Sequence, residues 1–148
     1  MARGDFTVFE EFAIQGGQEK HNFASDTIKV GIITNVAAPT AGDTTPAWSD
    51  YSANEVGTGG GYSAGGVTLS GVTWTEAAGV ATLDDTGNIA LAQNASGFTD
   101  GYWGILYNST EAGGAAIGFL DLGGPVSEVA GPIAINWNAS GILTVTVS

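Results

Sequence analysis

The stretch Gly57–Gly66, GTGGGYSAGG, separates two parts of the chain that differ in composition. Six of its ten residues are glycine, and Tyr62 is its one large side chain. Glycine adopts positive φ angles and lets other backbone approach closely, so the stretch predicts a sharply bent loop instead of a helix or an ordinary strand. A phosphate-binding glycine loop is followed by a helix and usually a lysine, whereas Val67–Trp74 has the pattern of a strand. We therefore interpret Gly57–Gly66 as a packing loop.

The part of the chain after this loop consists of short apolar segments bounded by glycine, asparagine and proline. In Val67–Trp74 the apolar side of the strand changes across Gly71, which predicts a β-bulge. Asp84–Asn88 lies between two apolar runs and predicts a hairpin turn in which Gly87 has a positive φ angle. Tyr102–Tyr107 is apolar on both faces, which indicates a strand that is covered on both sides. The remaining strands are expected at Val80–Leu83, Ile89–Ala92, Ala116–Leu122, Ile133–Trp137 and Leu143–Val147.

A short amphipathic helix is expected near the N-terminus. Thr7 and Glu10 match a capping box, in which both side chains bond to free amides at the start of a helix. Val8, Phe9 and Phe12 then share one face, and the glycine pair at 16–17 ends the helix. A helix of about eight residues is marginal on its own in water, so its aromatic face packs either on its own domain or on a partner.

Two further elements are expected between this helix and the glycine loop. Asp26–Thr34 predicts a strand, because large aliphatic side chains alternate with other residues along it. Pro46 is expected in the first turn of a helical segment that places Trp48 and Tyr51 on one face and ends near Val56.

Eight short strands punctuated by turn residues predict a mainly β fold. Our interpretation is an antiparallel β-sandwich of jelly-roll type with a short N-terminal helix. An open immunoglobulin-like topology is the alternative, because periodicity does not reveal the strand order. We divide the chain into an N-terminal segment, residues 1–25, and a β-sandwich domain, residues 26–148, that carries the glycine-rich loop 57–66. A chain of 148 residues is long enough to bury a core without disulfides, and it contains no cysteine.

The charge is unevenly distributed along the chain. All three basic residues, Arg3, Lys20 and Lys29, lie in the first 29 positions, whereas residues 30–148 contain ten acidic residues and no basic one. Nucleic acids and anionic membranes are bound mainly through lysine and arginine, so neither is expected as a partner. Only 12% of the residues are charged, against about 25% in a typical soluble domain, which predicts that another subunit covers part of the surface.

The residue types needed for catalysis and cofactor binding are scarce. His21 is the single histidine and has polar neighbours, so we expect a solvated side chain and no catalytic triad. No zinc, copper or haem site is expected, and Asp84–Asn88 lacks the full spacing and the distal glutamate of a calcium loop. No pair among the fifteen acidic residues stands out as a glycosidase pair. We expect a protein that is not an enzyme and that holds no cofactor.

Four tryptophans support one alternative, a carbohydrate- or receptor-binding module in which aromatic rings stack on a sugar. Trp74, Trp103 and Trp137 lie in predicted strands in phase with aliphatic residues, which is typical of core positions. Trp48 lies outside the predicted strands, and it is the tryptophan that we expect to be exposed.

Two runs of the sequence resemble small structural proteins of tailed bacteriophages, in particular those that decorate or cement the capsid. The runs are FTVFEEFAIQGGQEKHNFASDTIKVGIITN, Phe6–Asn35, and PTAGDTTPAWSDYSANEVGTGGGYSAGG, Pro39–Gly66. The resemblance implies a β-rich virion protein, often a homotrimer, that lies on the outer capsid surface and bridges subunits of the major capsid protein. Such a protein is made in the cytoplasm of the bacterial host. A component of the phage tail or neck is the competing structural interpretation.

Aromatic side chains of the N-terminal half are the expected contacts with the major capsid protein. Three phenylalanines near the chain end present more apolar area than a short helix can hide, and full burial of one such ring is worth roughly 1.5–3 kcal/mol. The glycine loop allows a neighbouring subunit to approach closely, and Tyr62 is expected to insert into that subunit. The candidate interface residues are Phe6, Phe9, Phe12, Phe23, Trp48, Tyr51 and Tyr62.

Overall fold

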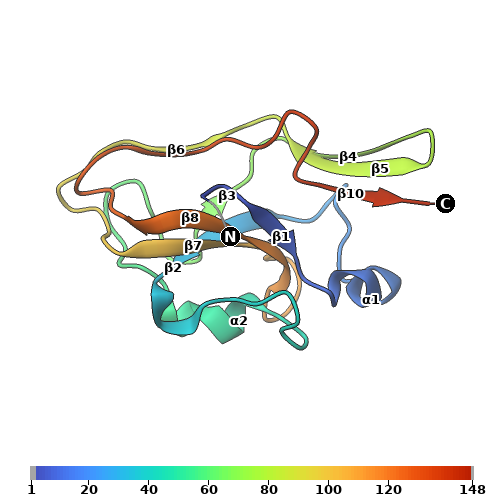
Figure 1. Cartoon of the computed structure of the whole chain (residues 1–148), viewed down its shortest axis with the longest axis horizontal. Coiled ribbons are helices and arrows are strands. Elements are labelled where there is room, and N and C mark those ends of the chain that lie inside the picture. The colour runs from blue at the N-terminus through green and yellow to red at the C-terminus, as the bar shows by residue number, and fades with distance from the viewer. Residues whose placement is uncertain (1–2, 148) are drawn as a thin grey trace.

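The computed structural model describes residues 3–147, and this part of the chain is mainly β (Figure 1). The strand pairs are antiparallel throughout the described residues. The helical elements are short: α1 (Phe12–Gly17), α2 (Trp48–Tyr51) and the 3-10 turns η1 (Asn35–Ala37) and η2 (Ser52–Asn54). The expectation of a mainly β, antiparallel fold is thus confirmed.

A five-stranded sheet lies in the middle of the molecule, with the strand order β1-β8-β7-β2-β3. Its long strands β7 and β8 share a β-bulge between Leu106 and Tyr107. The five strands are β1 (Phe6–Val8), β2 (Ile28–Ile33), β3 (Val67–Thr68), β7 (Gly101–Asn108) and β8 (Ala115–Val126).

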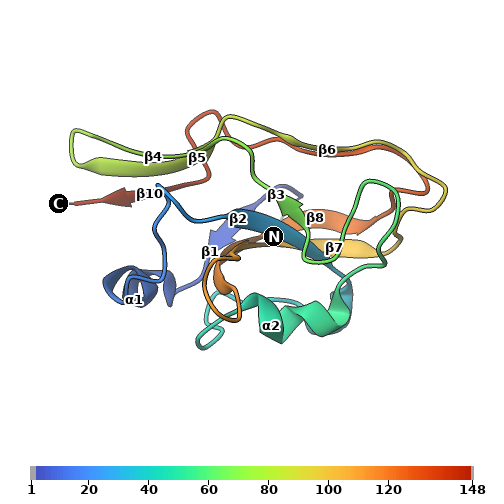
Figure 2. The same ribbon diagram turned by 180° about the vertical axis from the view of Figure 1, so that it is seen from behind.

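A second layer lies above this sheet in the view of Figure 1. It consists of a three-stranded sheet, β10-β5-β4, and a two-stranded sheet, β6-β9. Because β5 runs on into β6 and β9 runs on toward β10, the two sheets form one long ribbon, seen from both sides in Figures 1 and 2. The strands of this layer are β4 (Val72–Ala77), β5 (Val80–Asp85), β6 (Ile89–Leu91), β9 (Ile133–Ile135) and β10 (Leu143–Thr146).

Apolar side chains pack on both faces of the five-stranded sheet. The larger cluster joins it to the ribbon and includes Val30, Leu106 and Ile135. The smaller cluster, on the face toward α2, includes Ile105 and Phe119. Since Leu106 and Ile105 are neighbours on β7 and point to opposite clusters, the prediction that this strand is covered on both sides is confirmed.

The N-terminal capping box is not formed. Phe6–Val8 is strand β1, paired with β8, and the helix α1 begins only at Phe12. Burial of Phe9 between the sheet and α2 holds this segment extended, which overrides the local helical signal. The division of the chain at residue 25 therefore does not coincide with a break in the fold, because β1 belongs to the five-stranded sheet.

The second helical prediction is closer to the structure. Helix α2 begins at Trp48, with Pro46 preceding its first turn, and the helical run ends with η2 at Asn54. Trp48 and Tyr51 lie in the same cluster, as expected from their spacing.

Two local predictions are wrong: the bulge at Gly71 and the hairpin turn at Asp84–Asn88. At Gly71 the chain does not form a bulge but leaves β3 of the five-stranded sheet and enters β4 of the ribbon. Asp84–Asn88 does not close a hairpin, because β5 pairs with β4 and β10 while β6 pairs with β9. The hairpin turn is Ala78-Gly79, where both φ angles are positive, at 53° and 81°.

The glycine-rich stretch is a loop that packs against the body of its own chain. A side chain at Gly66 would overlap the carbonyl group of Val30 on β2, and one at Gly59 would overlap the carbonyl oxygen of Ser96. Both glycines also have positive φ angles. The packing interpretation of this stretch therefore agrees with the contacts in the structure.

Candidate functional site

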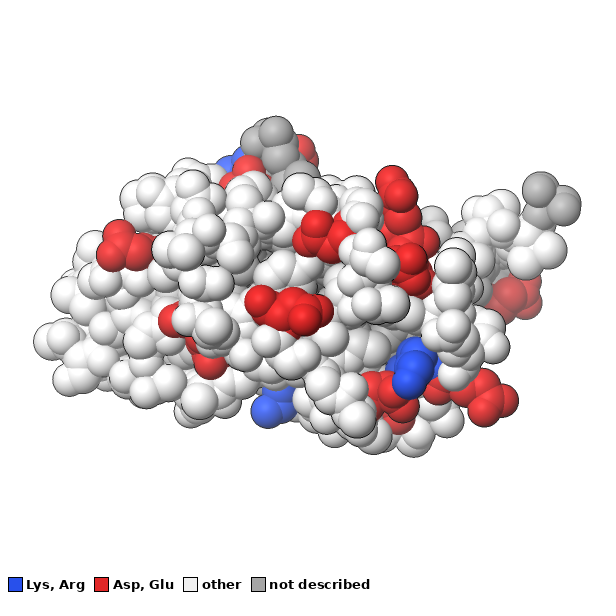
Figure 3. Space-filling view, turned by 90° about the horizontal axis from the view of Figure 1, so that it is seen from below, with Lys and Arg blue, Asp and Glu red and all other residues white. Residues whose placement is uncertain are grey.

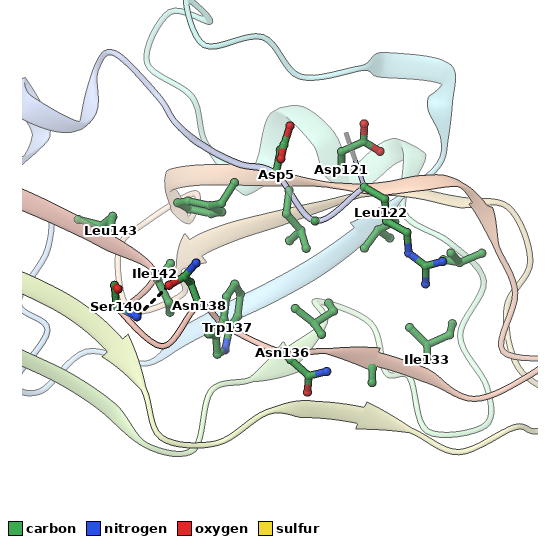
Figure 4. A pocket seen from close by; sticks show the side chains of 18 of the residues that line it. Asp5, Asp121, Leu122, Ile133, Asn136, Trp137, Asn138, Ser140, Ile142 and Leu143 are labelled. Carbon is green, nitrogen blue, oxygen red and sulfur yellow. Dashed lines mark hydrogen bonds between the residues drawn. The ribbon is translucent and has the colours of Figure 1, made fainter. Parts of the chain in front are cut away.

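A cleft of about 800 Å³ opens between the two layers at the β1 side of the molecule. Its lower wall is formed by the start of β1 and by Leu120–Leu122 of β8, and its upper wall by the chain from Ile133 to Asn138 and from Ser140 to Thr144. Figure 4 shows Leu122, Ile133 and Trp137 lying toward its interior. The chain between β9 and β10, residues 136–142, forms part of the upper wall and ends at Ile142, which is buried in the larger cluster.

Trp137 is the largest side chain of the cleft, and two contacts fix its orientation. Its Nε1–H donates a hydrogen bond of 3.3 Å to Oδ2 of Asp85. Phe6 meets it edge to face, with the ring centroids 6.5 Å apart and the ring planes at 90°. Asp85 is itself buried, and its Oδ1 accepts a 2.7 Å hydrogen bond from the amide of Gly71. The ring is therefore held in a defined position while remaining partly exposed.

Three polar residues along this cleft turn their side chains away from its interior (Figure 4). The carboxyl groups of Asp5 and Asp121 lie side by side on the face of β8 opposite to Leu122, and the side chain of Asn136 points to the other side of its strand from Trp137. Oδ1 of Asp121 accepts a 2.7 Å hydrogen bond from the amide of Gly123. Oδ1 of Asn138 accepts a 2.9 Å hydrogen bond from the amide of Ser140, so the side-chain amide of Asn138 keeps its N–H groups for other partners. Among residues 3–147, Arg3 is the one basic residue that lines the cleft.

A second exposed feature is the sheet β4-β5-β10, which extends past the end of the five-stranded sheet in Figure 1. The register places Trp74, Leu83 and Leu143 side by side on its inner face. Leu83 and Leu143 are buried, but on the same face Trp74 and Val145 each keep 40% of their surface exposed. The inner face of this overhanging sheet therefore carries large apolar side chains that its own chain covers only in part, and Glu76 lies on the same face, in register with Ala81 and Val145.

Glu128 lies fully buried beneath the glycine-rich loop. Its Oε1 accepts a 2.6 Å hydrogen bond from the amide of Gly61, and Oε2 is buried without a hydrogen-bond partner among the described residues. A side chain at Gly60 or Gly97 would collide with this glutamate. The glycines thus make room for a buried carboxyl group that ties the loop to the ribbon side of the molecule.

The single histidine is not solvated as expected. His21 stacks between Phe12 and Phe23, at centroid distances of 5.5 Å and 5.6 Å. Its Nε2 is 2.8 Å from Oε1 of Gln15, and its Nδ1 is buried without a partner among residues 3–147. Burial lowers the pKa of His21 to about 4, although nearby carboxylates act in the opposite direction. This ring is a packing element of the N-terminal segment.

The seven candidate interface residues divide into two groups. Phe6, Phe12 and Trp48 are partly exposed, and Phe6 lines the cleft. Trp48 stacks on Tyr107 at a centroid distance of 5.0 Å, with the rings 7° from parallel. The other four are buried within the chain and are not free for a partner in this conformation: Phe9, Phe23, Tyr51 and Tyr62.

Tyr62 does not point toward a neighbouring subunit. It is buried and forms hydrogen bonds within its own chain. Its hydroxyl donates to Oε1 of Glu55 and accepts from the amide of Ile32, both at 2.8 Å. Tyr51 makes a similar contact, a 2.6 Å hydrogen bond from its hydroxyl to Oδ2 of Asp43. Burial and the neighbouring carboxylates raise the pKa of both tyrosines well above the usual value, so both stay protonated.

The tryptophan prediction is reversed at one position. Trp74, expected in the core, is the most exposed tryptophan, because it lies on the edge strand β4; Phe23 packs against its ring at a centroid distance of 5.2 Å, and 40% of its surface stays exposed. The position of Trp137 in the lining of the cleft was also not predicted from the sequence. The flanking Asn136 and Asn138, polar neighbours on both sides of an aromatic residue just before a glycine turn, were the signal that could have suggested an exposed edge.

Acidic side chains are spread over the face shown in Figure 3, whereas basic ones occupy a few small areas. Within residues 3–147, no three histidine or acidic side chains come close enough to hold a metal ion. The same residues contain no helix long and apolar enough to cross a membrane.

No protein-family model matches the chain. Searches of curated proteins and of solved structures also found no significant match.

Proposed function

We propose that this protein is a non-enzymatic virion structural protein that decorates and stabilises the capsid of a tailed bacteriophage. In this proposal it lies on the outer capsid surface, bridges subunits of the major capsid protein and assembles as a homotrimer. We also infer that its two packed layers are a variant of the antiparallel β-sandwich. A tail or neck component is the competing location.

The observation that carries the proposal is the overhanging sheet β4-β5-β10. Its inner face exposes Trp74, Val145 and, two residues beyond, Val147, which keeps 79% of its surface exposed. Large apolar side chains gathered on one exposed face are typical of surfaces that another protein covers. The predicted contact therefore moves from the buried rings Phe9 and Tyr62 to this sheet.

Two further features favour a binding scaffold over an enzyme. The one histidine is packed between phenylalanines, which removes it as a general base for a nucleophile. The acidic body, with a formal net charge of −12, disfavours contact with the packaged genome and suits an outward position. The resemblance of Phe6–Gly66 to capsid decoration proteins supplies the partner, the major capsid protein.

The experiment mixes the purified chain with particles of the phage that encodes it, prepared without this protein, and locates added density by cryo-electron microscopy. Two variants on neighbouring residues of β10 form a matched pair. Val145→Asp places a charge on the inner face, and Thr144→Asp places the same charge on the opposite face. Full decoration by Thr144→Asp together with loss of decoration by Val145→Asp supports the proposal.

Light scattering on both variants separates the two contacts that this face can make. A trimer that becomes monomeric in Val145→Asp assigns the face to contact between copies, and an unchanged trimer that no longer decorates assigns it to the shell. Absence of the wild-type chain from the shell overturns the proposed function. Equal decoration by both variants would show that the inner face of the overhanging sheet does not contact the capsid shell.

A further inference from the structure

We propose that the free edge of β4 pairs with the same edge of a second copy of the chain, so that two overhanging sheets join into one continuous sheet. This inference goes beyond the proposed function, because it concerns the backbone edge of β4 and a contact that forms between copies in solution. β4 lies at the end of the strand order β10-β5-β4, and within residues 3–147 no other strand pairs with its outer edge. The edge therefore presents unpaired amide and carbonyl groups.

The strand β4 lacks three features by which proteins usually protect an edge strand, namely shortness, a lysine or proline, and a β-bulge. The edge strands β1 and β3 of the five-stranded sheet have three and two residues, whereas β4 has six. Its sequence, VTWTEA, contains no lysine and no proline, and its register with β5 is unbroken from Val72 to Ala77. Among the edge strands that the structure describes, β4 is therefore the longest and the most open to pairing.

The hairpin turn between β4 and β5 fixes which backbone groups point to this edge. A two-residue turn closes on a hydrogen-bonded pair, here Ala77 and Val80. Hydrogen-bonded and non-hydrogen-bonded pairs alternate along an antiparallel ladder. The N–H and C=O groups of Val72, Trp74 and Glu76 therefore point away from β5. These groups are evenly spaced along the edge, with Trp74 at the centre.

This spacing makes the edge complementary to itself. In an antiparallel pair of two β4 strands centred on Trp74, residues 72 and 76 of one copy lie opposite residues 76 and 72 of the other. The outward amides and carbonyls of both edges then find partners by two-fold symmetry, as an isologous contact requires. The two Trp74 side chains, each 40% exposed in the single chain, become cross-strand neighbours on the inner face, and aromatic pairs in this position are stabilising.

The charge of the edge also favours a second copy in this register. Glu76 is the one charged residue of β4, and it falls opposite Val72, so the two carboxylates do not face each other. Oε1 of Glu76 accepts a 2.6 Å hydrogen bond from the amide of Gly79, which holds the carboxylate toward its own turn. The turn lies past the end of the five-stranded sheet in Figure 1, so the body of an antiparallel copy is placed beyond it.

The expected contact is small. One strand pair and two tryptophans bury less than the roughly 1,200 Å² of a stable interface, so the pairing should be weak and dependent on concentration. Covalent trapping suits such a contact, and the chain offers a clean background for it because it contains no cysteine.

The test uses the full-length variants Thr73→Cys and Thr75→Cys, whose thiols lie on the outer face of β4, away from Trp74. In the proposed register, residue 73 of one copy lies directly opposite residue 75 of the other, within disulfide distance, whereas two copies of the same cysteine are diagonal neighbours about 7–8 Å apart. An equimolar mixture under mild oxidation should therefore give at least about fivefold more disulfide-linked dimer than either variant alone.

Thr82→Cys is the matched control. Thr82 lies on the same face, in register with Thr75, but on the central strand β5, so its mixtures with the two β4 variants should give no more dimer than the single variants.

A second pair of variants tests the free amides of the edge. Glu76→Pro removes an outward N–H group, whereas Glu76→Ala removes the same side chain and keeps the amide. Because each symmetric dimer loses two hydrogen bonds, Glu76→Pro should associate at least about tenfold more weakly than Glu76→Ala in sedimentation equilibrium. Circular dichroism verifies the fold of each variant, and the cross-linking decides alone if Glu76→Pro does not fold.

The proposal is overturned if the mixture of Thr73→Cys and Thr75→Cys yields no more dimer than each variant alone, or if folded Glu76→Pro and Glu76→Ala associate equally. Absence of any cross-link at millimolar concentration would assign the edge to a different partner and would likewise overturn pairing between copies. Failure of the chain to decorate a capsid leaves these outcomes unchanged, because they are measured on the free protein.

Discussion

At the scale of single residues, the glycine-rich stretch contains one position where a side chain cannot fit and another where it can. Gly66 has a φ angle of +85°, and a methyl group there would overlap the carbonyl of Val30, whereas nothing lies within 4 Å of the equivalent position at Gly57. We expect Gly66→Ala to destabilise the fold by more than about 2 kcal/mol. Gly57→Ala should be neutral or stabilise it by up to about 1 kcal/mol, because the change reduces the entropy of the unfolded chain.

Urea denaturation of the two glycine variants measures this difference directly. Equal stabilities for Gly66→Ala and Gly57→Ala would show that the loop does not pack against β2 in solution.

The buried histidine gives a residue-scale prediction about pH. Burial lowers the pKa of His21 to about 4, below its ordinary value of 6.5, so the unfolded chain binds a proton more readily than the folded one. The stability from this residue is complete above pH 6.5 and is lost as the pH falls toward 4. Because the ring keeps some contact with water, we expect a loss of about 1–2 kcal/mol.

The control for this prediction is His21→Phe, which keeps an aromatic ring between Phe12 and Phe23 but does not titrate. The stability difference between wild type and variant, from urea denaturation, should change between pH 7 and pH 4.5 in favour of the variant. A difference that is independent of pH would contradict the burial of a neutral imidazole.

At the scale of elements, the N-terminal segment is part of the core and not a detachable anchor. Phe9 packs on Phe119 of β8, with the ring centroids 5.2 Å apart, and is 1% exposed. We expect Phe9→Ala to cost about 3–5 kcal/mol, as truncation of a buried ring usually does. Ile14→Ala on α1, where the side chain is 54% exposed, should change the stability by less than about 1 kcal/mol.

Thermal and urea unfolding of these two variants test the role of the segment. The same packing implies that deletion of residues 1–25 unfolds the chain, because β1 and the buried rings Phe9 and Phe23 are lost together. A folded, cooperative truncated protein would show that residues 1–25 are not needed for the core.

At the scale of the whole molecule, the five-stranded sheet is the centre and the other parts cover its two faces. The ribbon covers one face and the segment around α2 covers the other (Figures 1 and 2). The overhanging sheet belongs to the ribbon, which extends past the five-stranded sheet there, whereas the cleft lies between the ribbon and the strands β1 and β8. Contact with a partner is therefore predicted where the ribbon extends past the five-stranded sheet.

Most strands were determined by the sequence alone, because alternation along a strand is a local property. The strands around Val30, Ile105 and Leu143 lie where their patterns predicted them, and the covered position of β7 was visible in its apolar character on both faces. The glycine loop was likewise predictable, since only glycine tolerates such close backbone approach. These inferences needed no knowledge of which strands are neighbours.

Only the tertiary structure decided which strands pair and which aromatic rings are buried. Strand β5 pairs with β10, about sixty residues later in the chain, and not with the adjacent β6, so the hairpin predicted at Asp84–Asn88 could not be excluded from local pattern. Phe9 and Trp74 both have large aromatic rings, yet Phe9 is covered by two elements and is 1% exposed, whereas Trp74 lies on an edge strand against Phe23 and is 40% exposed. The cleft joins Phe6 to Trp137 across almost the whole chain, and such long-range contacts depend on the packing of layers, which sequence periodicity does not encode.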